Sequence, residues 1–408
     1  MSAQEHPRAV LVRSSVYFRA AVLALLCSVA LAYALIPSRV AEFANHDPLH
    51  RWDDFGIFFS TAGCLSSGSC DPYPATPRPF PNLNPPHFHW LLTPLVGMDV
   101  ETAYRLWLLM SVAAVALSAL RTVRALGIAV SPLTAVGGAF ALLVSSVSWG
   151  TITYGQVYAV LMWPVTEAWL SARSSRWHRA AALLTAVATV KPLLLLPLAW
   201  LVWLRPRTLA TAAAVAVLVF GSGSVVHGID AYRGWYQDLG TVEASGSWAN
   251  GSISAALART FISTPWFRPT IAAPFLVWPL WIMLSLLLVF DLSSWSRRAS
   301  ADAAWLGALA AAFLISPRAW MYSAWLLVGP VMAVALRARW RAPEILFASA
   351  LLMLPVELTR VGQPNAVLTL LNGSIYTWAL GLLYVAARKA ITFREAPANG
   401  TERLHSER

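Results

Sequence analysis

The chain has 408 residues, of which 58% are hydrophobic and only 12% are charged, and its mean hydropathy is +0.59. This composition is too apolar for a soluble protein of this length, and it predicts an all-α, polytopic membrane protein without a soluble domain. The net charge of +11 is carried by arginines and only two lysines. Because no basic block is interleaved with aromatic residues, we assign this charge to cytoplasmic loops and expect no nucleic-acid partner.

The first apolar segment, 17–37, follows Arg8 and Arg13, has Arg19 near its start and resembles a signal peptide, with Ala32-Tyr33-Ala34 in the place of a cleavage site. It is longer than the roughly 7–15 apolar residues of a signal peptide, so we expect an uncleaved first helix. In all, about 11–12 transmembrane or re-entrant helices are expected. The later apolar segments are 103–120, 129–148, 153–172, 178–204, 208–226, 273–292, 301–316, 320–337, 344–357 and 374–387.

The segment 178–204 is interrupted by Lys191-Pro192. If this segment crossed the membrane once, every later arginine cluster would face outward, whereas cationic loops prefer the cytoplasm. Proline breaks a helix and disfavours helix at the residue before it, so we predict two short helices, 178–190 and 192–204, that enter and return. Each would be about 18–20 Å long. Such short, interrupted helices usually line a cavity.

With this break, both termini are cytoplasmic and two long loops, 38–102 and 227–272, lie outside. Residues 1–390 are expected to form a single transmembrane domain, and 391–408 a cytoplasmic tail that is disordered. The acidic pair Asp53-Asp54 then lies at the outer membrane surface, just after the first helix.

After this acidic pair, apolar residues recur at helical spacing at positions 55, 58, 59, 62 and 65. The pattern predicts an amphipathic helix at the membrane interface that begins near Asp54. One carboxylate would suffice to cap this helix, so the presence of two favours a general base at the membrane surface, either Asp53 or Asp54. His50, His87 and His89 are alternative proton acceptors.

Cys64 and Cys70 share the oxidising side of the membrane and could form a small disulfide loop, whereas Cys27 in the first helix is expected to pack. Zinc binding by these two cysteines with His87 and His89 matches no standard ligand spacing. The chain also lacks a DxD motif. We therefore expect no metal and no other cofactor.

Lys191 lies within the membrane, where a cation is costly and usually functional, and its expected partner is the phosphate of a lipid. The alternative is an internal salt bridge or snorkelling. Arg318 is a second candidate for the same phosphate, and the alternative is an interfacial anchor. Arg259 and Arg360 are weaker candidates.

Several polar residues of the outer segments are expected to line the mouth of the site as substrate-binding groups: Asn84, His87, His89, Tyr154, Gln156, Trp248 and Asn250. Together with an outward carboxylate and cations at phosphate depth, they indicate sugar transfer from a lipid-phosphate donor. The carboxylate would deprotonate an acceptor hydroxyl, and the cations would offset the charge of the leaving phosphate.

Five motifs occur in a characteristic order: Asp54-Phe55 with Phe58-Phe59, Asp71-Pro72-Tyr73, Asn82-Leu83-Asn84-Pro85-Pro86-His87-Phe88, Gly155-Gln156 and Lys191-Pro192. In these motifs the chain resembles glycosyltransferase family 87, membrane enzymes with the GT-C fold. The resemblance implies a bacterial plasma-membrane enzyme with an extracytoplasmic site in which Asp54, which directly precedes Phe55, is the base, with Asp53 as the second choice. It implies a polyprenyl-phosphate-sugar donor and a lipid-linked glycan acceptor, with inversion and without metal.

The resemblance leaves two donor sugars open. Mannose is preferred because the family contains α-(1→2)-mannosyltransferases, and the alternative is arabinofuranose from decaprenyl-phosphoarabinose. A more distant alternative is a transporter or lipid flippase, which would predict inverted repeats and polar groups near the midplane. No internal repeat is present in the sequence, and no protein partner is expected.

Overall fold

The computed structural model describes residues 54–68, 70–73, 82–129, 154–240, 246–263, 272–338, 343–354 and 373–391, with the single positions 131, 145, 147, 148, 151 and 269. The predicted first helix, the terminal tail, Asp53, His50 and Arg360 lie outside the described residues.

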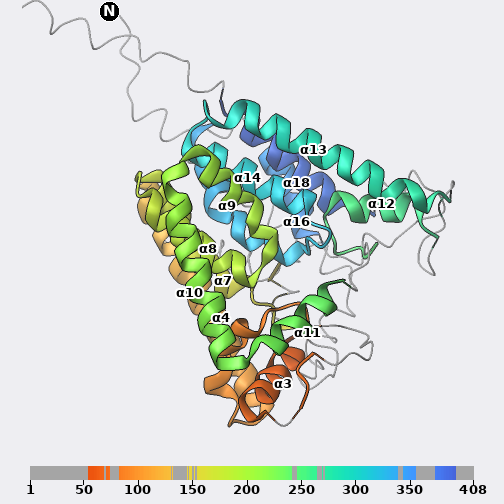
Figure 1. Ribbon diagram of the computed structural model, residues 1–408. Helices are drawn as coiled ribbons and strands as arrows, with labels where there is room; N and C mark the ends of the chain where they lie inside the picture. The colour runs from red at the N-terminus through yellow and green to blue at the C-terminus, as the bar shows by residue number, and fades with distance from the viewer. Residues whose placement is uncertain are drawn as a thin grey trace, which may run out of the picture.

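Every regular element in the described residues is helical, as predicted (Figure 1). The α-helices are α3 (Asp54–Ser67), α4 (Val100–Leu126), α7 (Tyr158–Arg173), α8 (Trp177–Val190), α9 (Leu195–Leu204), α10 (Leu209–His227), α11 (Ile229–Gly240), α12 (Ile253–Phe261), α13 (Val277–Ser296), α14 (Ala301–Ile315), α15 (Val328–Arg337), α16 (Pro343–Met353) and α18 (Ile375–Lys389). Short 3₁₀ turns join them, among them η1 (Pro86–Leu91), η3 (Pro192–Leu194) and η6 (Met321–Leu327).

Within the described residues, three helical stretches are long and apolar enough to cross a bilayer: Val100–Leu126, Pro206–His227 and Pro274–Ser296. Shorter apolar helices are Pro192–Leu204, Ala301–Ile315, Met321–Arg337 and Pro343–Met353, and the first of these belongs to the segment that the sequence predicts to be broken. The predicted single span 320–337 is divided into η6 and α15. The predicted outer loop 227–272 contains two helices, α11 and α12.

The predicted break at Lys191 is confirmed. Helix α8 ends at Val190, Lys191 is extended with φ −127° and ψ 94°, and η3 begins at Pro192. The proline has no N–H to continue the ladder, and it disfavours helix at the lysine before it. The chain then reverses direction. A contact shows this: the Arg205 guanidinium, just after α9, lies 4.6 Å from the ring centre of Trp177 at the start of α8.

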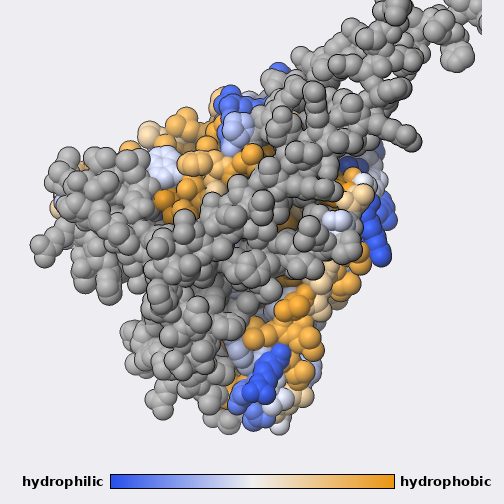
Figure 2. Space-filling view, turned by 180° about the vertical axis from the view of Figure 1, so that it is seen from behind, coloured by the Kyte–Doolittle hydropathy of each residue, from blue (hydrophilic) through white to orange (hydrophobic). Residues whose placement is uncertain are grey.

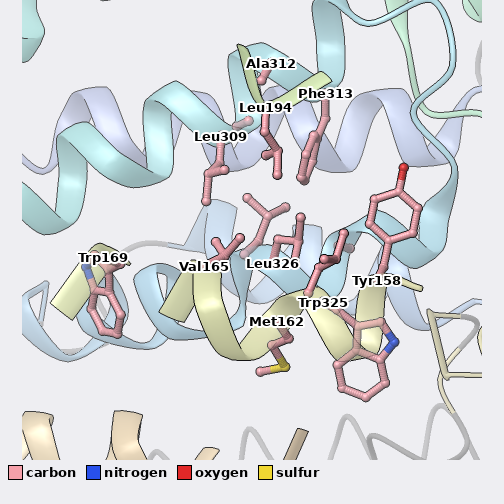
Figure 3. Close-up of a cluster of buried hydrophobic side chains, with 14 of the residues drawn as sticks. Tyr158, Met162, Val165, Trp169, Leu194, Leu309, Ala312, Phe313, Trp325 and Leu326 are labelled. Atoms are coloured by element: carbon pink, nitrogen blue, oxygen red, sulfur yellow. The ribbon is translucent and has the colours of Figure 1, made fainter. Parts of the chain in front are cut away.

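Helix α7 forms the centre of the core and packs against α4, α8, α14 and η6. Its inward side chains meet those of η3, α14 and η6 in the cluster drawn in Figure 3, where Val165, Leu194 and Leu326 lie together. At one end of the cluster Trp169 donates to the buried Asp302 at 3.1 Å. At the other end is Tyr158, so α7 extends from the core to the site described below.

Charge divides the two ends of the bundle. Most of the described cations lie at the end of the bundle where α4, α7, α9, α13, α15 and α18 finish, which we call the arginine end. Several of them form ion pairs or cation–π contacts there. These cations are Arg121, Arg124, Arg173, Arg176, Arg179, Arg205, Arg207, Arg297, Arg298, Arg337, Arg388 and Lys389. They outnumber the described acids there, which are Glu167, Asp291, Asp302 and Glu344. On the face seen in Figure 2, a hydrophobic band separates hydrophilic patches.

Candidate active site

A cavity of about 590 Å³ opens at the end of the bundle opposite the arginine end. The side chains that line it come from the start of α3, the segment before η1, the turn before α7, the break after α8, the end of α11 and the segment around Pro317. Six residues predicted from the sequence line it: Asp54, Asn84, Tyr154, Gln156, Lys191 and Arg318. Four more of the predicted residues, His87, His89, Trp248 and Asn250, are buried residues outside its lining, and Asp53 is not among the described residues.

Asp54 is the first residue of α3, where unpaired helix N–H groups favour a negative charge. The side-chain amide of Gln156 donates to its Oδ2. Gly155 makes this contact possible, because it has φ +66° and because a β-carbon there would lie 2.5 Å from the β-carbon of Phe55. Trp107 of α4 fixes the same turn by donating to the Gly155 carbonyl at 2.8 Å. Three distant segments thus orient one carboxylate.

Lys191 enters the cavity from the break between α8 and η3. Its Nζ donates to Oδ1 of Asn84 at 2.7 Å and lies 5.2 Å from the ring centre of Tyr158. Both partners are neutral, so the ammonium charge is oriented without being cancelled by them. A cation held in this way can still bind an anion.

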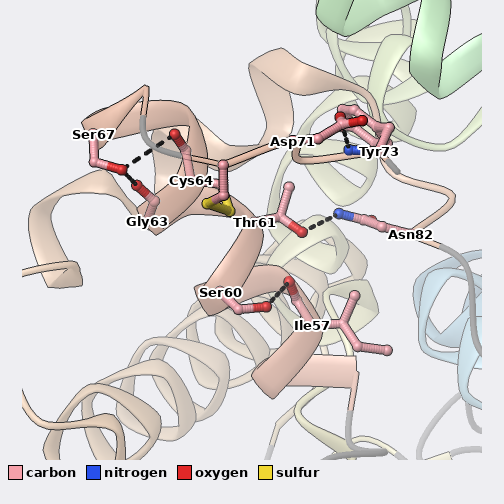
Figure 4. Close-up of a disulfide and its surroundings, with 10 residues drawn as sticks. Ile57, Ser60, Thr61, Gly63, Cys64, Ser67, Asp71, Tyr73 and Asn82 are labelled. Atoms are coloured by element: carbon pink, nitrogen blue, oxygen red, sulfur yellow. Dashed lines mark hydrogen bonds between the residues drawn. A yellow bond between two sulfur atoms is a disulfide. The ribbon is translucent and has the colours of Figure 1, made fainter. Parts of the chain in front are cut away.

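A chain of hydrogen bonds behind the cavity orients Asn84. Asn82 Oδ1 accepts from the Asn84 backbone N–H at 3.0 Å and from its side-chain amide at 3.2 Å. The amide nitrogen of Asn82 contacts Thr61 Oγ1 at 2.9 Å, shown in Figure 4, and His89 Nε2 at 3.0 Å. The other ring nitrogen of His89 faces the Phe58 carbonyl at 3.1 Å.

This pattern specifies a neutral His89 that donates from Nδ1 to the carbonyl and accepts at Nε2. Burial lowers the pKa of His89 to about 3. A proton at Nε2 would place two donors face to face and break the link to Asn82. His89 therefore supports the site from behind and does not face the cavity as a base.

Arg318 lines the cavity from the segment between α14 and η6. Its backbone N–H donates to Ser316 Oγ at 3.3 Å. Asn250, from the second outer loop, holds the same segment in place: its amide donates to the Pro317 carbonyl at 3.0 Å and its Oδ1 accepts from the Ala319 N–H at 3.0 Å. Asn250 thus shapes the cavity without lining it.

A family model for glycosyltransferase family 87 matches residues 82–317, more than half of the chain. The chain belongs to glycosyltransferase family 87. The matched range contains Asn84, Gln156 and Lys191, whereas Asp54 and Arg318 lie outside it. Comparison with curated proteins and with solved structures gave no match. The resemblance inferred from the sequence is therefore confirmed at the level of the family, and with it a membrane glycosyltransferase of the GT-C type.

The glycosyltransferase also has an aromatic wall that sequence reasoning missed. Tyr158, Trp320 and Tyr322 line the cavity, with ring centres 5.6 Å apart between the two tyrosines and 6.1 Å between Trp320 and Tyr322. Aromatic residues occur throughout this tryptophan-rich chain, so composition does not single these three out. The signal in the sequence that could have identified two of them is their position, since Trp320 and Tyr322 closely follow Arg318.

Helix α11 covers the Asn84 segment from outside. Trp235 donates to the Leu83 carbonyl at 3.1 Å, and Tyr232 Oη lies 2.9 Å from Nδ1 of His87. Burial lowers the pKa of His87 to about 4, so this ring is neutral near pH 7. His87, like His89, therefore supports the enzyme's site from outside the cavity lining.

A disulfide joins Cys64 in α3 to Cys70, six residues further on (Figure 4). It leads directly to Asp71, which accepts from the Tyr73 N–H at 2.9 Å, and Tyr73 Oη donates to the Asn84 carbonyl at 2.8 Å. Burial raises the pKa of Tyr73, so its hydroxyl remains a donor. Since both thiols are oxidised, they do not supply the zinc ligands considered from the sequence.

Buried Arg259, a weaker candidate for phosphate binding, lies outside the cavity lining. It donates to the Ser247 carbonyl at 2.7 Å, to the Asn250 carbonyl at 3.1 Å and to Ser374 Oγ at 3.2 Å. These bonds fix the second outer loop against α18.

Proposed function

We propose that this glycosyltransferase moves mannose from a polyprenyl-phosphate donor to a hydroxyl group of a lipid-linked glycan. One observation carries the proposal: the carboxylate of Asp54 and the cationic side chains of Lys191 and Arg318 line the same cavity. Transfer of a sugar from a phosphate to an alcohol requires two functions: a base that accepts the proton of the alcohol, and cations that bind the leaving phosphate.

In the proposed step, the acceptor hydroxyl gives its proton to Asp54 as its oxygen attacks the anomeric carbon. The bond from that carbon to the phosphate oxygen breaks, and its electron pair stays on the leaving polyprenyl phosphate. Lys191 and Arg318 stabilise the charge that develops there. Attack opposite the leaving group inverts the anomeric configuration. No metal is needed in this scheme, since the two cationic side chains supply the positive charge.

The separation of charge supports an extracytoplasmic site in a bacterial plasma membrane. Cationic loops favour the cytoplasmic side, and the described cations gather at the end opposite the cavity. Sugar nucleotides are absent outside the cytoplasm, so a donor linked to a membrane lipid fits this orientation.

The test is sugar transfer in proteoliposomes, with polyprenyl-phosphate mannose and polyprenyl-phosphate arabinose offered in parallel to a lipid-glycan extract. Asp54→Asn should reduce transfer by about 10²–10⁴-fold while the protein stays folded. Asp71→Asn is the matched control: this exposed aspartate lies outside the cavity lining, and an asparagine can still accept from the Tyr73 N–H.

Each outcome is informative. Transfer of arabinose alone would change the donor sugar to the alternative. Transfer that survives Asp54→Asn would remove Asp54 as the base. A folded wild type that transfers neither sugar would contradict the proposal and favour the transporter alternative.

A further inference from the structure

A second hollow, of about 420 Å³, lies at the arginine end, far from the catalytic cavity. It is formed at the seam of α4, α7 and α8, and Arg121, Trp163, Pro164, Glu167, Arg179 and Leu183 line it. We call it the Arg121–Arg179 groove. It takes no part in the proposed sugar transfer, because α7, about 24 Å long, carries Tyr158 at the cavity end and Glu167 toward the other.

Two arginines share one carboxylate in this groove. Arg121 donates from Nε to Glu167 Oε1 at 2.7 Å and from Nη2 to Oε2 at 3.3 Å, and Arg179 donates from Nη2 to Oε2 at 3.0 Å. The Glu167 side chain is 6% exposed, whereas those of Arg121 and Arg179 are 44% and 50% exposed. The groove therefore has an excess positive charge on its open side.

Donor groups remain available there. Within the described residues, Nη1 of Arg121 and both Nε and Nη1 of Arg179 make no hydrogen bond. Glu167 holds the two guanidinium groups on either side of one carboxylate, so they can act together on a single anion. Planar guanidinium donors fixed in this way suit the oxygen atoms of a phosphate.

The surroundings indicate that this phosphate belongs to a lipid. Trp163, Pro164 and Leu183 provide the apolar part of the groove lining. On α4, in the turn before Arg121, Leu117 and Leu120 are 48% and 44% exposed, so the helix that borders the groove also exposes apolar side chains. Cationic pockets between membrane helices bind anionic lipid head groups in this way.

We propose that the Arg121–Arg179 groove binds the phosphodiester of an anionic phospholipid in the leaflet at the arginine end of the bundle. Arg121 and Arg179 bind the phosphate, and Trp163 and Leu183 contact the glycerol and the upper acyl chains. Glu167 orients the arginines and also competes with the lipid for them.

The test measures binding of added phosphatidylglycerol to the delipidated protein by native mass spectrometry, with phosphatidylcholine as the zwitterionic reference without net charge. Each arginine near an anionic headgroup contributes about fivefold, so Arg121→Gln with Arg179→Gln should weaken phosphatidylglycerol binding by roughly 25-fold. Arg105→Gln is the matched control, since Arg105 is on the same helix and pairs with Glu101 away from the groove. Equal loss in both variants, or no loss in either, would overturn the proposal.

Glu167→Gln separates lipid binding from a purely structural ion pair. If the groove binds phosphate, this change releases both arginines and should strengthen phosphatidylglycerol binding several-fold. If the ion pairs only join helices, the change should lower the melting temperature and leave lipid binding unaltered, which would refute the proposal. Inorganic phosphate should not displace the lipid at equal concentration, and displacement would identify a free anion as the ligand instead.

Discussion

Asn84→Ala tests whether the hydrogen-bond chain behind the cavity positions Lys191 for the donor phosphate. The substitution removes the acceptor that Lys191 Nζ contacts at 2.7 Å and one of two bonds to Asn82. A hydrogen bond to a charged group is worth about 1.5–3 kcal/mol. If that orientation matters fully in the transition state, kcat/KM for the donor falls roughly 10- to 150-fold.

The assay is initial-rate transfer in proteoliposomes with varied donor and saturating acceptor, and then the reverse. The loss should appear in kcat/KM for the donor, while KM for the acceptor changes little. A folding defect would instead lower the rate without a selective effect on the donor, and the melting temperature would reveal it.

Thr61→Val is the control for Asn84→Ala. Thr61 belongs to the same network, where its Oγ1 contacts the Asn82 amide at 2.9 Å, but it does not touch Lys191. We expect this variant to keep kcat/KM within about threefold of wild type, since it removes one neutral hydrogen bond. Asn84→Ala with wild-type kcat/KM, or Thr61→Val with the same loss as Asn84→Ala, would refute the positioning role.

Three further predictions concern the support of the site. Between pH 6.5 and about 3 the unfolded chain binds a proton at His89 that the folded chain does not, so stability is present at neutral pH and lost on acidification, by about 2 kcal/mol at pH 5. Melting curves should show this slope, and a His89→Gln variant that still folds should show less of it; an unchanged slope would contradict the assignment. Replacing Cys64 and Cys70 by serine should destabilise the outer segment by about 2 kcal/mol through the small loop that they close, as measured by melting with and without reductant; equal melting temperatures would exclude this contribution. Gly155→Ala should reduce both the melting temperature and transfer, because φ is +66° and the new methyl group meets a buried side chain at 2.5 Å, whereas Gly63→Ala in open space should not; similar behaviour of the two variants would remove the steric argument.

The sequence predicted the backbone features that local chemistry dictates. Lys191-Pro192 marked a break that occurs within one residue of its expected place, because the steric effect of proline acts on its immediate neighbours. Helix α3 begins at Asp54 as expected, and Cys64 and Cys70 are close enough in the chain to pair. The span 320–337 was less predictable: it begins as a 3₁₀ segment and becomes α-helical only at Val328, two residues before Pro330.

The division of the polar residues between lining and support was not predictable from the sequence. Asn84 and His87 belong to the same short motif, yet one lines the cavity and the other is held by Tyr232 of α11. Contacts between residues far apart in the chain decide this, such as the 107-residue separation between Asn84 and Lys191. Polar residues in an outer loop have the same composition and periodicity in either role.

The break after α8 links the orientation of the protein to its chemistry. The break reverses the chain and returns Arg205 to the same end of the bundle as Trp177. The arginines of the later helices therefore lie at that end too. At the turning point the backbone is extended, and the side chain of Lys191 reaches Asn84 in the cavity. The proline that returns the chain to the arginine end therefore also places Lys191 in the cavity at the other end, whose lining it shares with Arg318 and where the proposed donor phosphate leaves.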